Sequence, residues 1–320
     1  VQKWVTACVH TFMLWRADTW RPWHASAPES AITPPLKQTL QQGAYAMLSL
    51  VLGTLNNRAV DVLIGVFLGA TVLGYVRLAW RVFDFVMQLA LQPLVNVAIS
   101  TFSALQADKA RLHTGYRQMV AVSALLAFPL FLGMAAVAER VVPLVFGTQW
   151  QPAVVLMQVM SLLALPAVIN SYFSPLMMSL GHNQVVFWQS IAQTVLSVTL
   201  TVLFAPWGVV WVLGAHVARA FTIMLLNLAL QQRYARMQVA PAVVDILWPL
   251  LLAILMAAGV VAVGAVLPMQ GWAGLAMLVG TGVILYSVLA LALLWCAQTL
   301  APHSVWAQLW HKAQHALKRI

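Results

Sequence analysis

Long apolar runs constrain this chain more than any other feature. A helix needs about 20 apolar residues to cross the hydrocarbon core of a membrane, which is about 30 Å thick. After the opening residues, the sequence contains eight runs of sufficient length, and residues 1–15 look like the end of one more. We therefore predict an all-α, polytopic bundle with about eight full transmembrane spans and one partial span at the N-terminus. The predicted full spans are 38–66, 72–103, 115–138, 152–178, 183–204, 207–230, 244–267 and 273–299.

The composition supports a membrane location and excludes several other classes. Of the 320 residues, 62% are hydrophobic and only 8% are charged, as expected when lipid solvates most of the surface. A formal charge of +10 also occurs in nucleic-acid-binding proteins, but here the charges are scattered between apolar runs, so we expect no nucleic-acid partner. Cys8 and Cys296 lie far apart in apolar stretches, which gives no support for a disulfide framework or a metal site.

The basic residues predict the orientation, because Lys and Arg prefer loops on the cytoplasmic side. The four basic clusters lie before the first full span and after the second, sixth and eighth, so an even number of spans precedes each of them. We therefore expect a multi-pass protein of the bacterial inner (plasma) membrane with a cytoplasmic C-terminus. The opening sequence has no cleavage-site pattern, and we interpret it as continuing from a longer protein. The clusters are Arg16, Arg21 and Lys37; Lys109, Arg111 and Arg117; Arg233 and Arg236; and Lys312, Lys318 and Arg319.

A polar stripe interrupts the second predicted span. At about 100° per residue its members fall within an arc of about 80°. If this span is one continuous helix, the stripe extends roughly 28 Å from Arg77 to Asn96. An Arg or Asp placed against lipid costs at least about 2.5–3.5 kcal/mol, so the stripe should line a bundle interior or a wet cavity. Its members are Arg77, Arg81, Asp84, Gln88 and Gln92.

Other spans carry polar residues that could share this cavity. Two readings remain open for the Gln, Ser and Thr positions: they line a path, or they hold helices together through hydrogen bonds. Ion pairing could also join Asp61 to Arg58 or Arg77, and Asp84 to Arg81. The four arginines of the set nevertheless outnumber its two aspartates, which suits an anionic passenger such as a phosphate or uronic acid group. The additional residues are Arg58, Asp61, Gln189, Gln193, Ser197, Thr201, His216 and Arg219, of which His216 is more often a packed residue than a proton switch.

Prolines inside predicted spans mark places where the helices should bend. Pro93 and Pro129 each lie within one span, and Pro166 and Pro175 bracket the sequence AVINSYFS. That sequence is either a hinge or a static kink. No carboxylate pair, His/Cys/Asp cluster or phosphate-binding glycine loop is convincing, so we expect no metal, no cofactor and a transporter rather than an enzyme.

Several stretches resemble polysaccharide exporters of the Wzx type. The sequence NNRAVDVLIGVFLGATVLGYVRLAWRV is similar to the motif that opens a lobe in those proteins, with an Asp before an "hhIG" sequence and then "LGxYxxAxR". PLVNVAISTFSALQADKARLHTGYRQMV, VVPLVFGTQWQPAVVLM and SPLMMSLGHNQ follow with similar content and order. The resemblance runs from about residue 37 to 230. It is strongest to the branch that includes colanic acid exporters, within the multidrug, oligosaccharidyl-lipid and polysaccharide exporter superfamily.

The resemblance implies two six-helix lobes around a central cavity, with alternating access moving an undecaprenyl-diphosphate-linked oligosaccharide between leaflets. The chain would supply the second lobe and an extra helix pair, without most of the first lobe. Expected partners are the lipid-linked substrate and membrane lipids, with polysaccharide polymerase and glycosyltransferases as candidates. The implied segments are the end of a preceding helix (1–15), a cytoplasmic linker (16–37), the six-helix lobe (38–230), two additional helices (244–299) and a basic interfacial tail (303–320).

Residue roles follow from this reading, and two alternatives remain. A cation-coupled multidrug antiporter of the same superfamily would need an unpaired acidic residue deep in the membrane. A membrane polymerase or ligase of the same pathway would need a long outer loop. Under the exporter hypothesis, the candidate substrate-binding residues are Arg77, Arg81, Arg219, Gln88, Gln92, Gln189 and Gln193, and the candidate ion-pair or coupling residues are Arg58, Asp61 and Asp84.

Overall fold

The computed structural model describes residues 36–266, 271–300, 305, 306 and 308. The chain divides into two compact units, 1–41 and 42–320, and of the first unit only the start of one helix is described. The predicted segment 1–15, nearly all of the predicted linker and all but three residues of the predicted tail lie outside the described residues.

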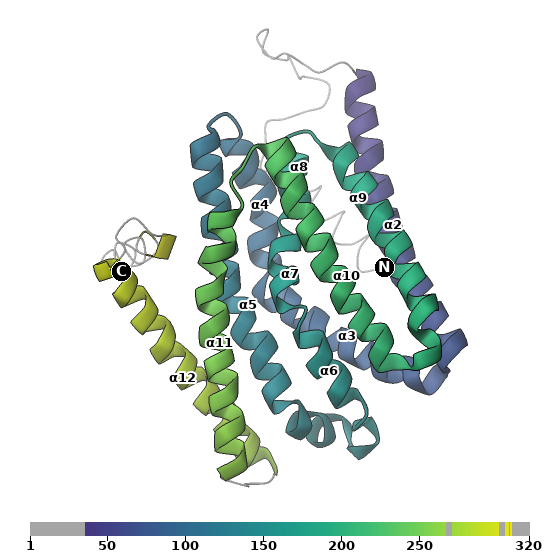
Figure 1. Cartoon of the computed structure of the whole chain (residues 1–320), viewed down its shortest axis with the longest axis vertical. Helices are drawn as coiled ribbons and strands as arrows, with labels where there is room; N and C mark the ends of the chain where they lie inside the picture. The colour runs from purple at the N-terminus through teal and green to yellow at the C-terminus, as the bar shows by residue number, and fades with distance from the viewer. Residues whose placement is uncertain (1–35, 267–270, 301–304, 307, 309–320) are drawn as a thin grey trace, which may run out of the picture. The chain divides into compact units, whose positions relative to one another are not determined.

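Helices form almost all of the described chain, and no strand occurs in these residues. Three short 3-10 or π turns, Thr148–Trp150, Ala205–Trp207 and Gln231–Ala235, lie between or after them. The helices, labelled in Figure 1, are α2 (Leu36–Leu68), α3 (Ala70–Ala90), α4 (Gln92–Leu105), α5 (Lys109–Phe146), α6 (Ala153–Ser161), α7 (Ala164–Ser171), α8 (Phe173–Ser179), α9 (Asn183–Phe204), α10 (Val209–Leu230), α11 (Ala240–Val266) and α12 (Gly271–Leu300).

The helices confirm a multi-pass membrane protein. Six of them, with the short turns that extend α9 and α10, are long and apolar enough to cross a membrane by length and composition. Two further spans consist of helix pairs that bend, α3 with α4 by 50° and α6 with Ala164–Ser179 by 53°. Counting each bent pair once gives up to eight spans. This total agrees with the eight full spans predicted from the apolar runs.

The predicted second span is not one straight helix. It breaks at Leu91, and Pro93 is the second residue of α4. A proline ring clashes with the carbonyl four residues earlier and lacks the N–H that would bond to it, so the chain turns just before it. Residues of the polar stripe beyond Leu91 therefore point in a different direction from those before it. By contrast, Pro129 lies inside α5, which remains one helix.

The AVINSYFS segment is also irregular. The bend between α6 and α7 falls at Leu162 and Leu163, just before Pro166, and a second interruption separates α7 from α8 at Tyr172. The Ser171 hydroxyl donates to the Ala167 carbonyl at 2.7 Å. Asn170 Nδ2 donates to the Ala220 carbonyl of α10 at 3.4 Å. Both polar side chains thus bond to backbone carbonyls.

The additional helices dock on α5. Figure 1 shows α11 running alongside α5, and their contact includes a two-bond ion pair in which Arg117 Nε and Nη2 donate to Asp245 at 2.7 and 3.1 Å. Tyr286 of α12 donates from its hydroxyl to the Leu125 carbonyl at 2.7 Å. These contacts join α11 and α12 to the other helices of residues 42–320, and the functional division between 38–230 and 244–299 stays a prediction.

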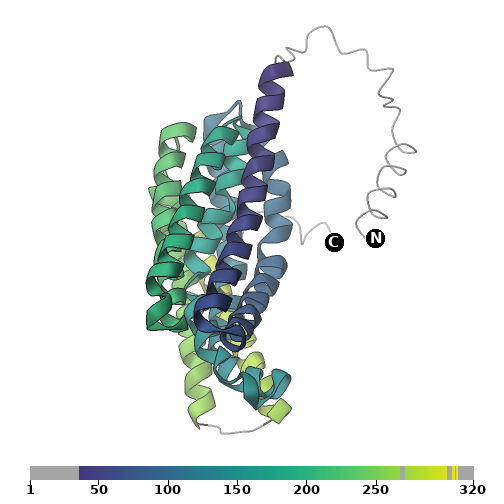
Figure 2. The same ribbon diagram turned by 90° about the vertical axis from the view of Figure 1, so that its right-hand side faces the viewer.

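On another side of the bundle, α2 lies beside the start of α9. Figure 2 shows α2 in purple as a long helix in front of the other helices. The Tyr45 and Phe187 rings pack with centroids 5.4 Å apart. Asn183 Nδ2 donates to the Gln42 carbonyl at 3.0 Å. These contacts place the polar residues of α2 opposite those of α9 and α10.

Candidate substrate cavity

A polar cavity lies between α2, α3, α9 and α10. Its volume is about 670 Å³. All four arginines of the predicted set line it, and so do both aspartates. We call it the arginine cavity. Its lining residues are Asn56, Asn57, Arg58, Val60, Asp61, Arg77, Trp80, Arg81, Asp84, Phe85, Gln88, Ser197, His216 and Arg219.

Two tight turns bring these residues to a similar depth along their helices. Gly69 (φ 87°) joins α2 to α3, and Gly208 (φ 102°) begins α10 after the turn from α9, a backbone conformation that glycine adopts without strain. Asp61 and Arg77 each lie eight residues from Gly69, and His216 lies eight residues after Gly208. Eight residues of helix rise about 12 Å. The charged groups therefore meet well inside the span and not at its end.

One ion pair forms inside the arginine cavity. Arg77 Nη2 lies 3.2 Å from Asp61 Oδ2, with side-chain exposures of 57% and 23%. The sequence left open whether Asp61 pairs with Arg58 or Arg77, and the structure selects Arg77. Within the described residues, Arg58, Arg81 and Arg219 have no ion pair. The cavity wall therefore offers three guanidinium groups that no carboxylate neutralises directly.

Asp84 does not form the ion pair with Arg81 that the sequence suggested. It is exposed to the cavity, and in the described part of the chain it has no ion-pair partner. The four arginines and two aspartates of the lining leave an excess of two positive charges. The arrangement can therefore attract an anion while still holding one free carboxylate.

His216 belongs to a buried part of the wall. Its side chain is 3% exposed, and its Nε2 lies 3.0 Å from Thr201 Oγ1 of α9. Thr201 in turn donates to the Ser197 carbonyl at 2.8 Å. Among the described atoms, Ser197 Oγ, His216 Nδ1 and Arg219 Nε are buried without a hydrogen-bond partner. The packed, hydrogen-bonded reading of His216 is thus the one that the structure supports.

Three of the glutamines proposed for the same site lie outside the arginine cavity. Gln92 follows the break at Leu91 and is exposed elsewhere. Gln189 Nε2 donates to Gln193 Oε1 at 3.2 Å, and Gln189 lines a groove on another face of α9. A four-residue repeat advances 400° in a helix, so successive members drift by about 40°. Of this repeat on α9, only Ser197 lines the cavity.

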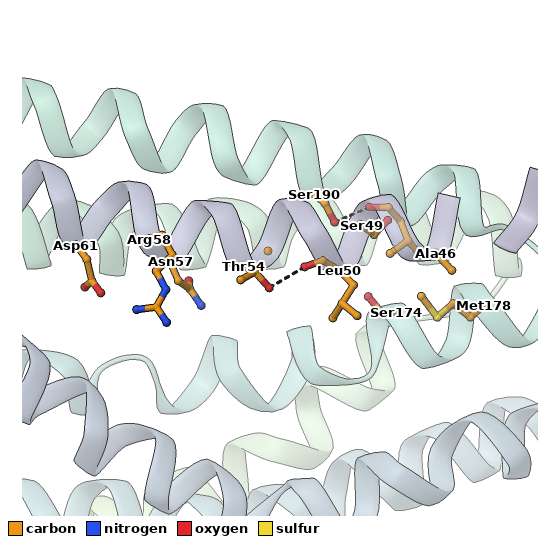
Figure 3. Close-up of a pocket in the computed structure, with 12 residues that line it drawn as sticks. Ala46, Ser49, Leu50, Thr54, Asn57, Arg58, Asp61, Ser174, Met178 and Ser190 are labelled. Carbon is orange, nitrogen blue, oxygen red and sulfur yellow. Dashed lines mark hydrogen bonds between the residues drawn. The ribbon is translucent and has the colours of Figure 1, made fainter. Parts of the chain in front are cut away.

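A second cavity adjoins the first along α2. It has a volume of about 590 Å³ and shares Asn57, Arg58 and Asp61 with the arginine cavity. Figure 3 shows these residues at one end and Ser49, Thr54 and Ser174 toward the other. Sequence reasoning did not propose this part of the site. Ala, Ser, Gly and Thr at positions 46, 49, 53 and 54 of α2 gave the signal, because small residues at helical spacing leave room beside a helix.

The fold and the cavity define the class: a multi-pass helical membrane protein with a positively charged cavity between its helices. Residues 1–155 match the model of a family described as "Polysaccharide biosynthesis protein". This match confirms the resemblance to polysaccharide exporters for the part of the predicted range before residue 156 and extends it to residue 1. Residues 156–230 of the predicted range lie outside the family match.

Three relatives are also named as proteins of polysaccharide biosynthesis or transport. The chain is 27% identical to the teichuronic acid biosynthesis protein TuaB of Bacillus subtilis (strain 168), over 48% of this chain and 32% of the relative. It is 26% identical to the lipopolysaccharide biosynthesis protein WzxC of Escherichia coli (strain K12), over 51% of this chain and 33% of the relative. It is 29% identical to the succinoglycan biosynthesis transport protein ExoT of Rhizobium meliloti (strain 1021), over 42% of this chain and 27% of the relative.

The matched part spans about a third of the length of these relatives. No solved structure matches the chain. The chain is therefore similar to proteins of polysaccharide biosynthesis and transport.

Proposed function

We propose that the chain forms one lobe of an exporter that carries an anionic, lipid-linked oligosaccharide across the bacterial inner membrane by alternating access. The observation that carries the proposal is the arginine cavity, in which four arginines and two aspartates meet inside the spans. Charges buried at this depth in lipid would be costly, whereas a cavity that receives a charged passenger gives them a role. The names of the relatives, which concern teichuronic acid, lipopolysaccharide and succinoglycan, support a polysaccharide as cargo.

The free guanidinium groups would bind the diphosphate of the passenger. A guanidinium presents paired N–H donors that match two phosphate oxygens, and such charge-assisted bonds are stronger than neutral ones. Arg81 and Arg219 have no ion pair in the described residues, so they need not release a carboxylate before they bind. Arg77 is held by Asp61 and would contribute charge from a fixed position. Gln88 offers an amide for sugar hydroxyl groups.

The bent helix pairs supply the places where the lobe would change shape. The α3–α4 bend carries cavity residues on its first half, and α8 contributes Ser174 to the adjoining cavity. Broken helices are common where transporters form substrate sites, because backbone groups freed at the break can line a cavity. By this proposal the substrate is linked to undecaprenyl diphosphate. Glycosyltransferases act before the transport step, and a polymerase acts after it.

The Arg81→Ala substitution in the full-length protein tests the proposal. We expect polymer export to fall at least about tenfold and lipid-linked repeat units to accumulate on the inner leaflet, because loss of one phosphate contact costs about 1.5–3 kcal/mol. Arg81→Lys should restore only part of the export, since Lys keeps the charge but not the paired donors. Arg111→Ala removes an exposed arginine outside the cavity and serves as the control. Normal polymer output from Arg81→Ala at equal protein abundance would contradict the role.

One observation favours a second candidate function, a cation-coupled antiporter. Asp84 is a carboxylate inside the spans with no ion pair in the described residues, the feature expected of a site that binds a proton or a metal cation. Asp84→Asn separates the two candidates. An antiporter would lose drug efflux in this variant and keep it in Arg81→Ala, whereas the exporter should be more sensitive to Arg81→Ala.

A further inference from the structure

A groove distinct from both cavities lies on another face of α9. Its volume is about 460 Å³, and α2, the turn after α8, α9 and the end of α10 form its walls. Val186 and Ser190 of α9 face the small-residue end of the adjoining cavity, whereas Val185, Trp188 and Ala192 line this groove. We call it the aromatic groove. It is therefore separate from the arginine cavity in the residues that form it.

The aromatic groove is polar at the end formed by the start of α9, which we call its mouth, and more apolar further along α9 and α10, where Gln189 is the polar residue of the lining. His182 and Gln184 lie at the start of α9, and Tyr234 lies just after the end of α10. Ala192 and Leu226 line the groove about two helical turns further along the same helices, roughly 12 Å from the mouth. A ligand that fills the groove should therefore have a polar end and an apolar end roughly 12 Å apart.

Aromatic rings line the mouth, and a positive charge, that of Arg233, lies next to it without lining the groove itself. The His182 and Tyr234 rings pack with centroids 5.3 Å apart, and Arg233 Cζ lies 5.8 Å from the centre of the Tyr234 ring. Trp188 also lines the groove and is 59% exposed. None of the residues that line the groove is acidic. Tyr and Trp favour the membrane interface, and basic side chains there attract anionic lipid headgroups.

We propose that the aromatic groove binds an anionic phospholipid of the leaflet that meets the start of α9. The phosphate would lie at the mouth beside Arg233 and near the start of α9, where the helix dipole is positive. One acyl chain would run along Ala192, Leu226 and Leu230. The proposal does not depend on the transported substrate, because it concerns no residue of the arginine cavity.

Native mass spectrometry of the whole chain tests the proposal, after reconstitution with equal amounts of phosphatidylglycerol and phosphatidylcholine. We expect wild-type protein to retain phosphatidylglycerol preferentially. Leu226→Trp should fill the groove and abolish this preference. Leu225→Trp changes the neighbouring, 63% exposed residue that does not line the groove, so it should behave like wild type. Arg233→Gln should lower the preference about fivefold, the factor that about 1 kcal/mol per basic side chain produces.

Three results would overturn the proposal. The first is equal retention of phosphatidylglycerol by the Leu226→Trp and Leu225→Trp variants. The second is equal retention of the two lipids by wild type, which would show that the groove does not select an anionic headgroup. The third is complete displacement of phosphatidylglycerol from wild type by equimolar undecaprenyl phosphate, which would assign the groove to the substrate. If Leu226→Trp fails to fold, Arg233→Gln alone decides, and an unchanged preference in that variant contradicts the proposal.

Discussion

At the scale of single residues, pairing distinguishes the charges of the arginine cavity. Arg77 is paired with Asp61, whereas Arg81, Arg219 and Asp84 have no ion pair within the described residues. An exposed ion pair contributes only about 0–1 kcal/mol to folding, because water screens it. The Arg77–Asp61 pair, with the Arg77 side chain 57% exposed, should therefore matter more for the charge of the cavity than for stability.

Asp61→Asn tests this distinction. We expect the melting temperature to change by no more than about 4 °C. Affinity for inorganic diphosphate should rise about two- to fivefold, because the positive excess in the cavity grows by one charge. Isothermal titration of the purified protein measures the affinity, and Arg81→Ala should change it in the opposite direction. A fall in affinity for Asp61→Asn would show that Asp61 serves the site by holding Arg77 in place.

At the scale of helices, breaks and docking contacts decide which residues meet. Pro93 ends the predicted 28 Å stripe early by turning the chain at Leu91, and Gln88 is the last stripe residue that lines the cavity. On the other side of α5, a mostly buried ion pair holds α11. Asp245 has a side-chain exposure of 9% and Arg117 of 26%. Removing one partner of such a pair leaves a buried charge without compensation.

Asp245→Asn should destabilise the protein by about 3–5 kcal/mol, since it leaves Arg117 buried without its carboxylate. Unfolding in denaturant, followed by circular dichroism, measures the loss. Asp108→Asn is the matched control: its pair with Arg111 is exposed, with side-chain exposures of 52% and 79% for Asp108 and Arg111, and Asn caps the start of α5 about as well as Asp. Arg117→Met with Asp245→Leu should recover most of the stability. Equal effects of Asp245→Asn and Asp108→Asn would exclude a structural role for the buried pair.

At the scale of the whole molecule, the spans and the basic clusters together predict an orientation. Lys109 and Arg111 lie at the start of α5, and Arg233 and Arg236 lie after α10. If each bent pair crosses once, these clusters are separated by an even number of spans and meet the same side of the membrane. The positive-inside preference predicts that this side is the cytoplasm.

Labelling of single cysteines in whole cells checks this orientation. In a background with Cys8→Ser and Cys296→Ser, a membrane-impermeant maleimide should label Gln151→Cys in intact cells. It should label Lys109→Cys only after permeabilisation. The two positions lie at opposite ends of α5 and its following turn, so each is the control for the other. Labelling of Lys109→Cys in intact cells would reverse the proposed orientation.

The site was predicted from the sequence only in part, and the reason differs between residues. Arg77, Arg81, Asp84 and Gln88 precede the break in their helix, so the 100° spacing placed them together correctly. Gln92 does not line the arginine cavity, because spacing cannot show a change of helix direction. Gln189 and Gln193 do not line it either, because a polar residue on a helix gives no sign of which neighbour it faces. The Ser and Thr positions of the adjoining cavity were missed because small residues also pack between helices.

The sequence by itself determined the class of the molecule. Length and hydropathy of the apolar runs predict helical spans, up to eight in the described residues, because a backbone in lipid must satisfy its own hydrogen bonds. The excess of arginine over aspartate in those runs fixed the sign of the cavity charge. Only the tertiary structure decided that Asp61 pairs with Arg77, that Asp84 stays unpaired in the described residues, and that two faces of α9 line separate cavities. These depend on distances between helices that are remote in sequence, which local spacing does not encode.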